Sequence, residues 1–325
     1  MVKWLSYFVF VILNLFQHPI INAQNQKIDS LKALLKKDKE DTVKVNHLVA
    51  LVQVVRYTDL DTAIVLSRQA MALAQKAKSK KHLANSYHVI AEAYRLKANY
   101  PAAIENNLKS LSLREELGDK LGIAKSLCNI GSVYMEHASY PMARDYYLRA
   151  FKIGMELGDE KIISTLCGNL GIIYKDQGDY SKALEYFFRA LKMDEKLGNK
   201  KGVARHFSSI GTLYDRQLDY SRALDYYFKA MKINEELGNK IGVSIDLGNI
   251  GGLYIEQANY SKALAYCFRA LKIAEELGVK NAIAMHFGNI GAVYVAQGDS
   301  ALAKGNRIYA MGDRYPLALD IFLEF

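Results

Sequence analysis

Proline and cysteine are both scarce in this chain of 325 residues. There are 4 prolines against 22 glycines, and a chain with so little proline can form long helices that end at glycine. Cysteine occurs 3 times, and an odd number of thiols cannot all pair within one chain in an oxidising compartment. Cys128, Cys167 and Cys267 stand at apolar positions, so we interpret them as small buried hydrophobic residues.

Recognisable catalytic motifs are missing as well. The sequence contains no HExxH, no GxSxG, no GxxxxGK[ST] phosphate-binding loop and no paired CxxC. His206 and His286 occupy equivalent repeat positions, but no partners stand at metal-ligand spacing beside them. We therefore expect a protein that is not an enzyme and that holds no cofactor and no metal. An enzyme with an active site of an unrecognised kind is the alternative.

The formal net charge of +9 would suit a nucleic-acid or anionic-membrane partner if the basic residues formed one stripe. Instead, Lys and Arg are interleaved with Asp and Glu, as in RALKMDEKLG at residues 189–198. Such a pattern is typical of solvated helix faces. We expect no nucleic-acid partner, and a polyanion-binding site is the alternative.

The start of the chain differs from the rest. Lys3 precedes the apolar run WLSYFVFVILNLF (Trp4–Phe16), and a short polar stretch then leads to Ala23. This order predicts a Sec-type signal peptide over residues 1–23, cleaved after Ala23. The run is shorter than the ~20 residues that a spanning helix prefers, so an uncleaved anchor is the alternative and the only expected membrane contact. In both cases the remainder is exported, to the periplasm or the outside of the cell.

One segment of twenty residues occurs three times with a period of forty. DYSKALEYFFRALKMDEKLG (179–198) returns as DYSRALDYYFKAMKINEELG (219–238) and as NYSKALAYCFRALKIAEELG (259–278). Each repeat contains two segments in which apolar residues follow the i, i+3, i+4, i+7 spacing of a buried helix face. Residues 127–134 are an example of the first segment, and residues 183–191 of the second. An Asn, Asp or Ser N-cap opens the second half, and a Leu-Gly pair ends it. The pattern therefore predicts an all-α protein built from helical hairpins.

The order of a large apolar residue, Gly and Tyr, followed by Tyr-x-x-Ala, an aromatic residue and Ala, resembles the tetratricopeptide repeat. The variant is a forty-residue one with a Leu-Gly-Asn signature, as in LGNIGGLY (Leu247–Tyr254). The resemblance implies an α-solenoid of stacked helix-turn-helix hairpins in a right-handed superhelix, because one hairpin cannot bury its own faces. The expected parts are a signal peptide (1–23), a lead-in (24–41), six units (42–79, 80–119, 120–159, 160–199, 200–239, 240–279) and an irregular, incomplete seventh unit (280–325).

An asparagine ladder is the candidate binding site. It comprises Asn129, Asn169, Asn249 and Asn289, and Ser209 interrupts it. An amide can both donate to and accept from a peptide backbone, and in tetratricopeptide repeats the first helix lines the concave face. Resemblance to members that clamp a carboxylate implies that Asn169 and Arg205 could hold a peptide carboxylate, although Ser209 fills the remaining basic position. The alternative is that the asparagines bond to neighbouring helices inside the stack.

Two functions are compatible with these features. The first is a non-enzymatic exported scaffold that binds a peptide or an extended protein segment in its concave groove. The second is a sensory input region, since exported arrays of this kind are similar to those of bacterial membrane signalling proteins with a histidine kinase, cyclase or DNA-binding output. The expected partner is a protein or peptide in either case.

Overall fold

The computed structural model describes residues 25–298, and it is helical throughout apart from short turns. The predicted signal peptide and the last part of the predicted seventh unit lie outside the described residues. No helix within residues 25–298 is long and apolar enough to cross a bilayer. A helix over residues 25–37 is followed by α2 (Thr42–Val55), α3 (Leu60–Lys76), α4 (Lys80–Leu96), α5 (Tyr100–Glu116), α6 (Lys120–Glu136), α7 (Tyr140–Leu157), α8 (Glu160–Asp176), α9 (Tyr180–Lys196), α10 (Lys200–Arg216), α11 (Tyr220–Glu236), α12 (Lys240–Glu256), α13 (Tyr260–Leu277) and α14 (Lys280–Ala296).

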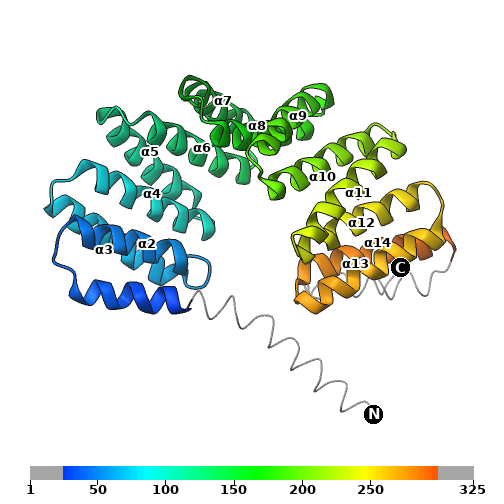
Figure 1. Ribbon diagram of the computed structural model, residues 1–325, viewed down its shortest axis with the longest axis horizontal. Coiled ribbons are helices and arrows are strands. Elements are labelled where there is room, and N and C mark those ends of the chain that lie inside the picture. The colour runs from blue at the N-terminus through cyan, green and yellow to red at the C-terminus, as the bar shows by residue number, and fades with distance from the viewer. Residues whose placement is uncertain (1–24, 299–325) are drawn as a thin grey trace, which may run out of the picture. The chain divides into compact units, whose positions relative to one another are not determined.

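The helix boundaries follow from local capping chemistry. The carboxylate of Asp179 accepts a hydrogen bond from the backbone N–H of Lys182 at 3.1 Å, which opens α9, and Asp219 opens α11 in the same way. At the other end, Gly158 caps α7 with φ +64° in the left-handed region, where a side chain would be strained. The predicted all-α hairpin solenoid is therefore confirmed, with antiparallel helix pairs following one another along the chain (Figure 1).

Inside each hairpin, the first helix provides a small residue where the second provides a large one. A Cβ added to Gly131 would lie 2.7 Å from two ring carbons of Tyr147, and one added to Gly211 would lie 2.9 Å from two of Tyr227. In the unit of residues 80–119, an alanine stands at the glycine position and Asn107 replaces the aromatic residue. Asn107 is 1% exposed, and neither atom of its amide has a hydrogen-bond partner in the described chain. The size of one partner thus limits the size of the other.

The chain divides into an N-terminal unit, up to Ile173, and a C-terminal unit, from Tyr174 onward. In the N-terminal unit the first helices α2 and α4 contact each other, and in the C-terminal unit α12 contacts both α10 and α14. Second helices of successive repeats do not make comparable contacts in the described residues. The first helices therefore form the more tightly packed layer of each unit. We use the term inner face for the surface of this layer that is turned away from the second helices.

Buried polar pairs join successive repeats, and they differ from junction to junction. Each pair combines a residue near the end of one second helix with a residue twelve positions later on the next first helix. Arg114 Nη1 donates to Ser126 Oγ at 3.0 Å, His206 Nε2 to Asp194 Oδ2 at 3.1 Å, and Asn234 Nδ2 to Asp246 Oδ2 at 2.8 Å. All six side chains are almost fully buried, so each pair satisfies polar groups that would otherwise be stranded in the core.

Candidate functional site

A polar pocket of about 470 Å³ lies on the inner face of the C-terminal unit. Helices α10 and α12 form most of its wall, and the end of α11 and the turn before α12 complete it. Its lining residues are Asn199, Lys201, Gly202, Arg205, Ser208, Ser209, Thr212, Asn234, Asn239, Gly242, Ile245, Asp246 and Asn249.

The structure brings two of the sequence-selected residues, Arg205 and Asn249, into this pocket, together with Ser209, which interrupts the ladder. Arg205, Ser209 and Asn249 all line it, although they come from two different repeats. Asn249 is half-buried, and its amide makes no hydrogen bond to the rest of the described chain. Its donor and acceptor atoms are therefore available to a ligand, as peptide-backbone binding requires.

The other ladder asparagines have different surroundings. Asn289 Nδ2 donates to the carbonyl oxygen of Gly248 at 3.4 Å, and Asn129 Nδ2 lies 2.8 Å from His88 Nδ1, so both amides contact the preceding first helix. Asn169 lies in the N-terminal unit and is not among the pocket residues. Its side chain makes no hydrogen bond within the described residues. The ladder thus contains both inter-helix contacts and uncommitted amides, and peptide binding by its members stays a prediction.

Two cations of the pocket have no acidic partner. Lys201 and Arg205 are exposed on α10, one helical turn apart, and neither forms an ion pair within residues 25–298. The neighbouring Lys200 shows the contrast, because its Nζ lies 3.0 Å from Glu236 Oε2. An ammonium and a guanidinium without partners give this end of the pocket a positive potential that favours an anionic group.

The wall of the pocket contains a buried acid. Asp246 is 1% exposed, and its two carboxylate oxygens accept hydrogen bonds from Ser208 Oγ at 2.6 Å and Asn234 Nδ2 at 2.8 Å. Burial is the main cause that raises the pKa of Asp246 to about 6, while the two hydrogen bonds act in the opposite direction. Both oxygens have neutral partners inside the protein, and this carboxylate forms no ion pair with Lys201 or Arg205.

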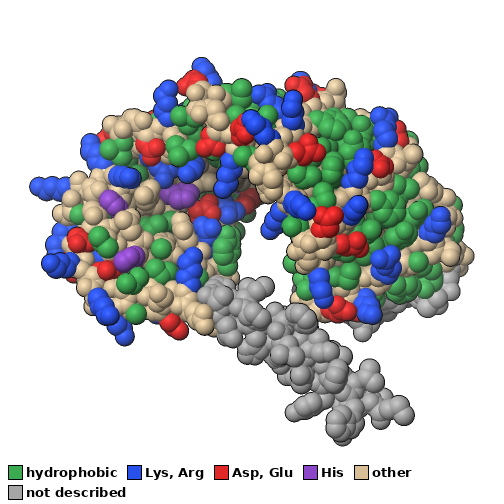
Figure 2. Space-filling model, in the orientation of Figure 1, with side chains coloured by type: hydrophobic (Ala, Val, Ile, Leu, Met, Phe, Trp, Pro, Cys, Tyr) green, Lys and Arg blue, Asp and Glu red, His purple; other side chains and the backbone are tan. Residues whose placement is uncertain are grey.

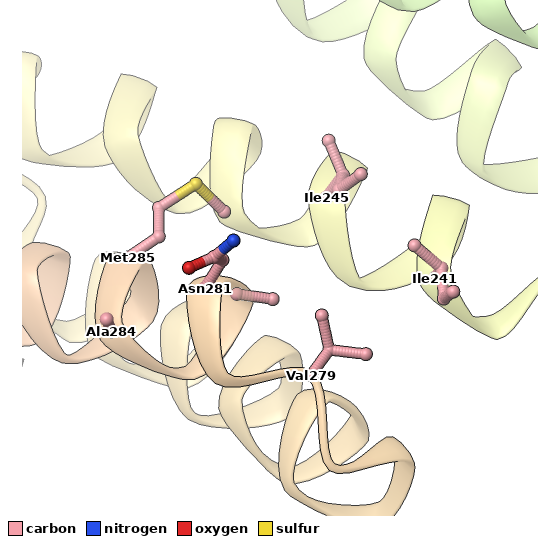
Figure 3. Close-up of a pocket in the computed structure, with 7 residues that line it drawn as sticks. Ile241, Ile245, Val279, Asn281, Ala284 and Met285 are labelled. Atoms are coloured by element: carbon pink, nitrogen blue, oxygen red, sulfur yellow. The ribbon is translucent and has the colours of Figure 1, made fainter. Parts of the chain in front are cut away.

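A second, apolar pocket of about 630 Å³ adjoins the first on the same inner face. Figure 3 shows side chains from α12 and α14, together with Val279 in the turn before α14, around a shared hollow. Ile241, Ile245 and Met285 are 49%, 42% and 40% exposed. Ile245 lines both pockets, so the aliphatic surface continues into the polar one.

Sequence reasoning did not select these aliphatic residues or Asp246. The sequence nevertheless contained a signal. Arg205, Ile245 and Met285 stand at equivalent exposed positions of the first helix in three successive repeats, and only the first of them is polar. An apolar residue at a solvated repeat position is the feature to look for, because exposed apolar clusters mark interaction sites. Among residues 25–298 there is no group of three or more His, Cys, Asp or Glu side chains placed to hold a metal ion.

The inner face of the N-terminal unit has a different character. Glu92 Oε2 lies 3.6 Å from Arg56 Nη1 and 3.3 Å from Arg95 Nη2, and Arg95 also pairs with Glu136. All of these side chains except that of Glu136 are at most 20% exposed. His88 accepts a hydrogen bond from Asn129, and its pKa is lowered to about 4, first by burial and then by the charge of Arg114. Glu92, the two arginines and Glu136 therefore form one paired cluster.

The fold and the grooved inner face define a helical-repeat scaffold. A tetratricopeptide-repeat model matches residues 84–156 and 161–236, so this part of the chain consists of tetratricopeptide repeats. A search of curated proteins gives no match.

Several solved structures have the same fold. The apo form of the quorum sensor NprR from B. thuringiensis is 16% identical with a TM-score of 0.70, over 94% of this chain and 86% of NprR. Apo RapI is 15% identical with a TM-score of 0.69, over 83% of this chain and 97% of RapI. A signal transduction ATPase with a tetratricopeptide repeat sensor from Pyrococcus horikoshii is 18% identical with a TM-score of 0.72, over 100% of this chain but 49% of that protein.

Proposed function

We propose that the protein is a non-enzymatic, exported scaffold that binds a peptide or an extended protein segment along α10, α12 and α14. The observation that carries this proposal is the position of Arg205, Ser209 and Asn249 in one pocket that continues into an aliphatic one. An extended chain presents backbone amides and side chains at intervals, and such a surface offers a partner for each of them. A structural neighbour supports the class of ligand, since a Rap protein has been solved in complex with competence and sporulation factor.

Asn249 and Asn289 provide a matched pair of variants to test the binding proposal. Peptides would first be selected from a random library against residues 24–325. Asn249→Ala should then weaken binding of a selected peptide by about 2- to 12-fold, the loss of one hydrogen bond, while the melting temperature stays unchanged. Asn289→Ala removes an inter-helix hydrogen bond and should instead lower the melting temperature. If both variants melt early and bind with unchanged affinity, the asparagines serve only the fold.

Export is the second element of the proposal, and the apolar N-terminal segment supports it. A fusion of residues 1–30 to a reporter that is active only outside the cytoplasm should give signal. A reporter that stays in the cytoplasm would remove the exported location and leave the binding groove untouched.

A sensory input region is the second candidate function. The match to only 49% of a signal transduction ATPase whose tetratricopeptide repeats are its sensor favours this alternative. The DNA that follows the gene is the simplest test: a continuing reading frame with a membrane helix and a kinase, cyclase or DNA-binding domain would support it. A stop codon followed by an unrelated gene would favour the free scaffold.

A further inference from the structure

We propose that the ligand of the C-terminal unit carries an aliphatic side chain that fills the pocket between α12 and α14, and an acidic group, displaced along the chain, that pairs with Lys201 and Arg205. This inference rests on the proposed binding function and adds the chemistry of the ligand.

The acidic part of the ligand follows from charge complementarity. Lys201 and Arg205 are exposed on one face of α10 and have no acidic partner in the described chain. The nearest acid on the pocket wall, Asp246, is buried and uses both oxygens for Ser208 and Asn234. The two cations outnumber the single carboxylate of Asp246 in the pocket lining, so a net positive charge faces a ligand. A carboxylate can accept hydrogen bonds from both cations and would be favoured over an amide or an ammonium.

The aliphatic part follows from the neighbouring pocket. Three of its side chains, Ile241, Ile245 and Met285, are between 40% and 49% exposed. Val279, Ala282 and Ala284 extend the apolar lining, and Asn281 is its one polar residue. A pocket of about 630 Å³ has room for a large aliphatic or aromatic side chain. Burying such a side chain removes apolar surface from water, so the pocket can anchor a short peptide.

The two parts belong to one site because Ile245 lines both pockets. Along the inner face, α10 carries the cations, and α12 and α14 carry the aliphatic residues. A bound chain that runs across these helices would therefore meet the cations at one end and the apolar hollow at the other. A polynucleotide fits this surface less well, since two cations beside an aliphatic hollow offer it few phosphate contacts.

The test is an array of synthetic twelve-residue peptides probed with labelled protein of residues 24–325. Each peptide would carry Leu, Ile or Phe at one position and Asp, Asn or Lys at another, in all spacings. Peptides with an aliphatic residue and Asp should bind at one preferred spacing, and their Asn counterparts should bind roughly tenfold or more weakly, as for loss of a charged hydrogen bond.

Variants separate the two halves of the site. The double variant Lys201→Gln and Arg205→Gln should lose the preference for Asp over Asn and keep the preference for Leu. Ile245→Asn with Met285→Gln should do the reverse. Lys200→Gln, which breaks the outward pair with Glu236, and Phe268→Ser, which removes a side chain that is 47% exposed on α13, are controls that should change neither preference.

The outcomes distinguish this inference from the proposed function. Peptides that bind without regard to Asp or Leu, or binding that all four groove substitutions leave unchanged, would overturn the ligand chemistry while peptide binding stands. Absence of binding to every peptide in the array would overturn both. Binding that follows acidic content alone and is displaced by single-stranded DNA would show a polyanion surface in place of the paired site.

Discussion

The two units are built from the same repeat but present different inner faces. In the N-terminal unit, Glu92 joins two arginines and His88 accepts from Asn129, so polar groups bind one another. In the C-terminal unit, Lys201 and Arg205 have no acidic partner, and aliphatic residues lie exposed beside them. On the face of both units visible in Figure 2, acidic and basic side chains are interspersed without one basic stripe. The buried positions set the fold, and a few exposed positions of the first helices set what each unit can bind.

Acidification should give the largest effect, which in the C-terminal unit comes from two buried histidines and is opposed by the protonation of Asp246. His206 and His286 are buried, and Nδ1 of each has no hydrogen-bond partner in the described chain. Burial is the main cause that lowers the pKa of both imidazoles to about 4. Because the folded pKa lies below the ordinary value of 6.5, their contribution to stability is present above pH 6.5 and is lost as the pH falls toward 4. Each histidine should account for about 1–3 kcal/mol.

Hydrogen exchange at pH 7 and pH 4.5, compared after correction for the intrinsic rate, would measure this loss in each unit. The N-terminal unit has one comparable histidine, His88, with its pKa lowered to about 4. His286→Gln keeps a donor for Ser244, which lies 2.9 Å from His286 Nε2, and should remove part of the acid sensitivity. A loss of protection in the C-terminal unit that His286→Gln leaves unchanged would contradict the role of this histidine.

Repacking one hairpin of the N-terminal unit should give the next largest effect. Asn107→Tyr alone should destabilise the protein by about 1–3 kcal/mol, because the ring would meet the methyl group of Ala91. Adding Ala91→Gly reproduces the pairing of Gly131 with Tyr147, and the double variant should exceed the wild type, since a buried amide without partners is removed. Urea unfolding would measure both changes. A double variant no more stable than Asn107→Tyr would show that the two sites are not coupled.

Removing the buried acid of the C-terminal unit should have a smaller, stabilising effect. The folded pKa of Asp246 is raised to about 6, so its protonated form stabilises the fold below pH 3.8 and this contribution is lost as the pH rises through 6. In Asp246→Asn, the amide can accept from Asn234 and donate to Ser208 Oγ, and the hydroxyl hydrogen of Ser208 can then be donated to Ala204 O. We expect a gain of about 1 kcal/mol at pH 7 that disappears near pH 4. The exposed Glu195→Gln is the control for thermal melting, and a gain that persists at pH 4 would contradict the charge mechanism.

Breaking the paired charges of the N-terminal unit should give the smallest effect. Glu92→Gln leaves Arg56 unpaired and leaves Arg95 with Glu136 alone, so stability should fall by about 0.5–1 kcal/mol. The variant should also give this inner face a weak affinity for the acidic peptides of the array. Glu105→Gln, which breaks an exposed pair with Lys109, should change neither quantity. An unchanged melting temperature for Glu92→Gln would show that these pairs do not stabilise the unit.

The fold could be predicted from the sequence because its determinants are local and repeated. Asp179 and Asp219 as N-caps and Gly158 as a left-handed C-cap follow directly from residue type and position. The backbone conformation of the turns inside the hairpins was harder to predict from the sequence. Ala138 and Leu218 adopt φ +56° and +62°, a conformation that residue type does not suggest outside glycine and asparagine.

The candidate site was predictable only in part, because it depends on contacts between repeats. The period of forty places every ladder asparagine on the first helix, yet it cannot distinguish Asn289, which bonds to Gly248 O, from Asn249, which has no such bond. The spacing also does not show that Arg205 has no acidic partner, whereas Arg95 pairs with both Glu92 and Glu136. Such pairing depends on side-chain reach between helices, which periodicity does not encode.

The junction pairs have a genetic consequence. Near-identical repeats invite unequal recombination, and loss of residues 200–239 would preserve both the reading frame and the hairpin pattern. It would, however, bring Asp194 opposite Asp246, and two carboxylates would share a buried site built for one. Like charges in such a site force one group to hold a proton or the stack to open. The buried pairs at this junction therefore restrict where within the repeat such a loss can occur without placing two acids together.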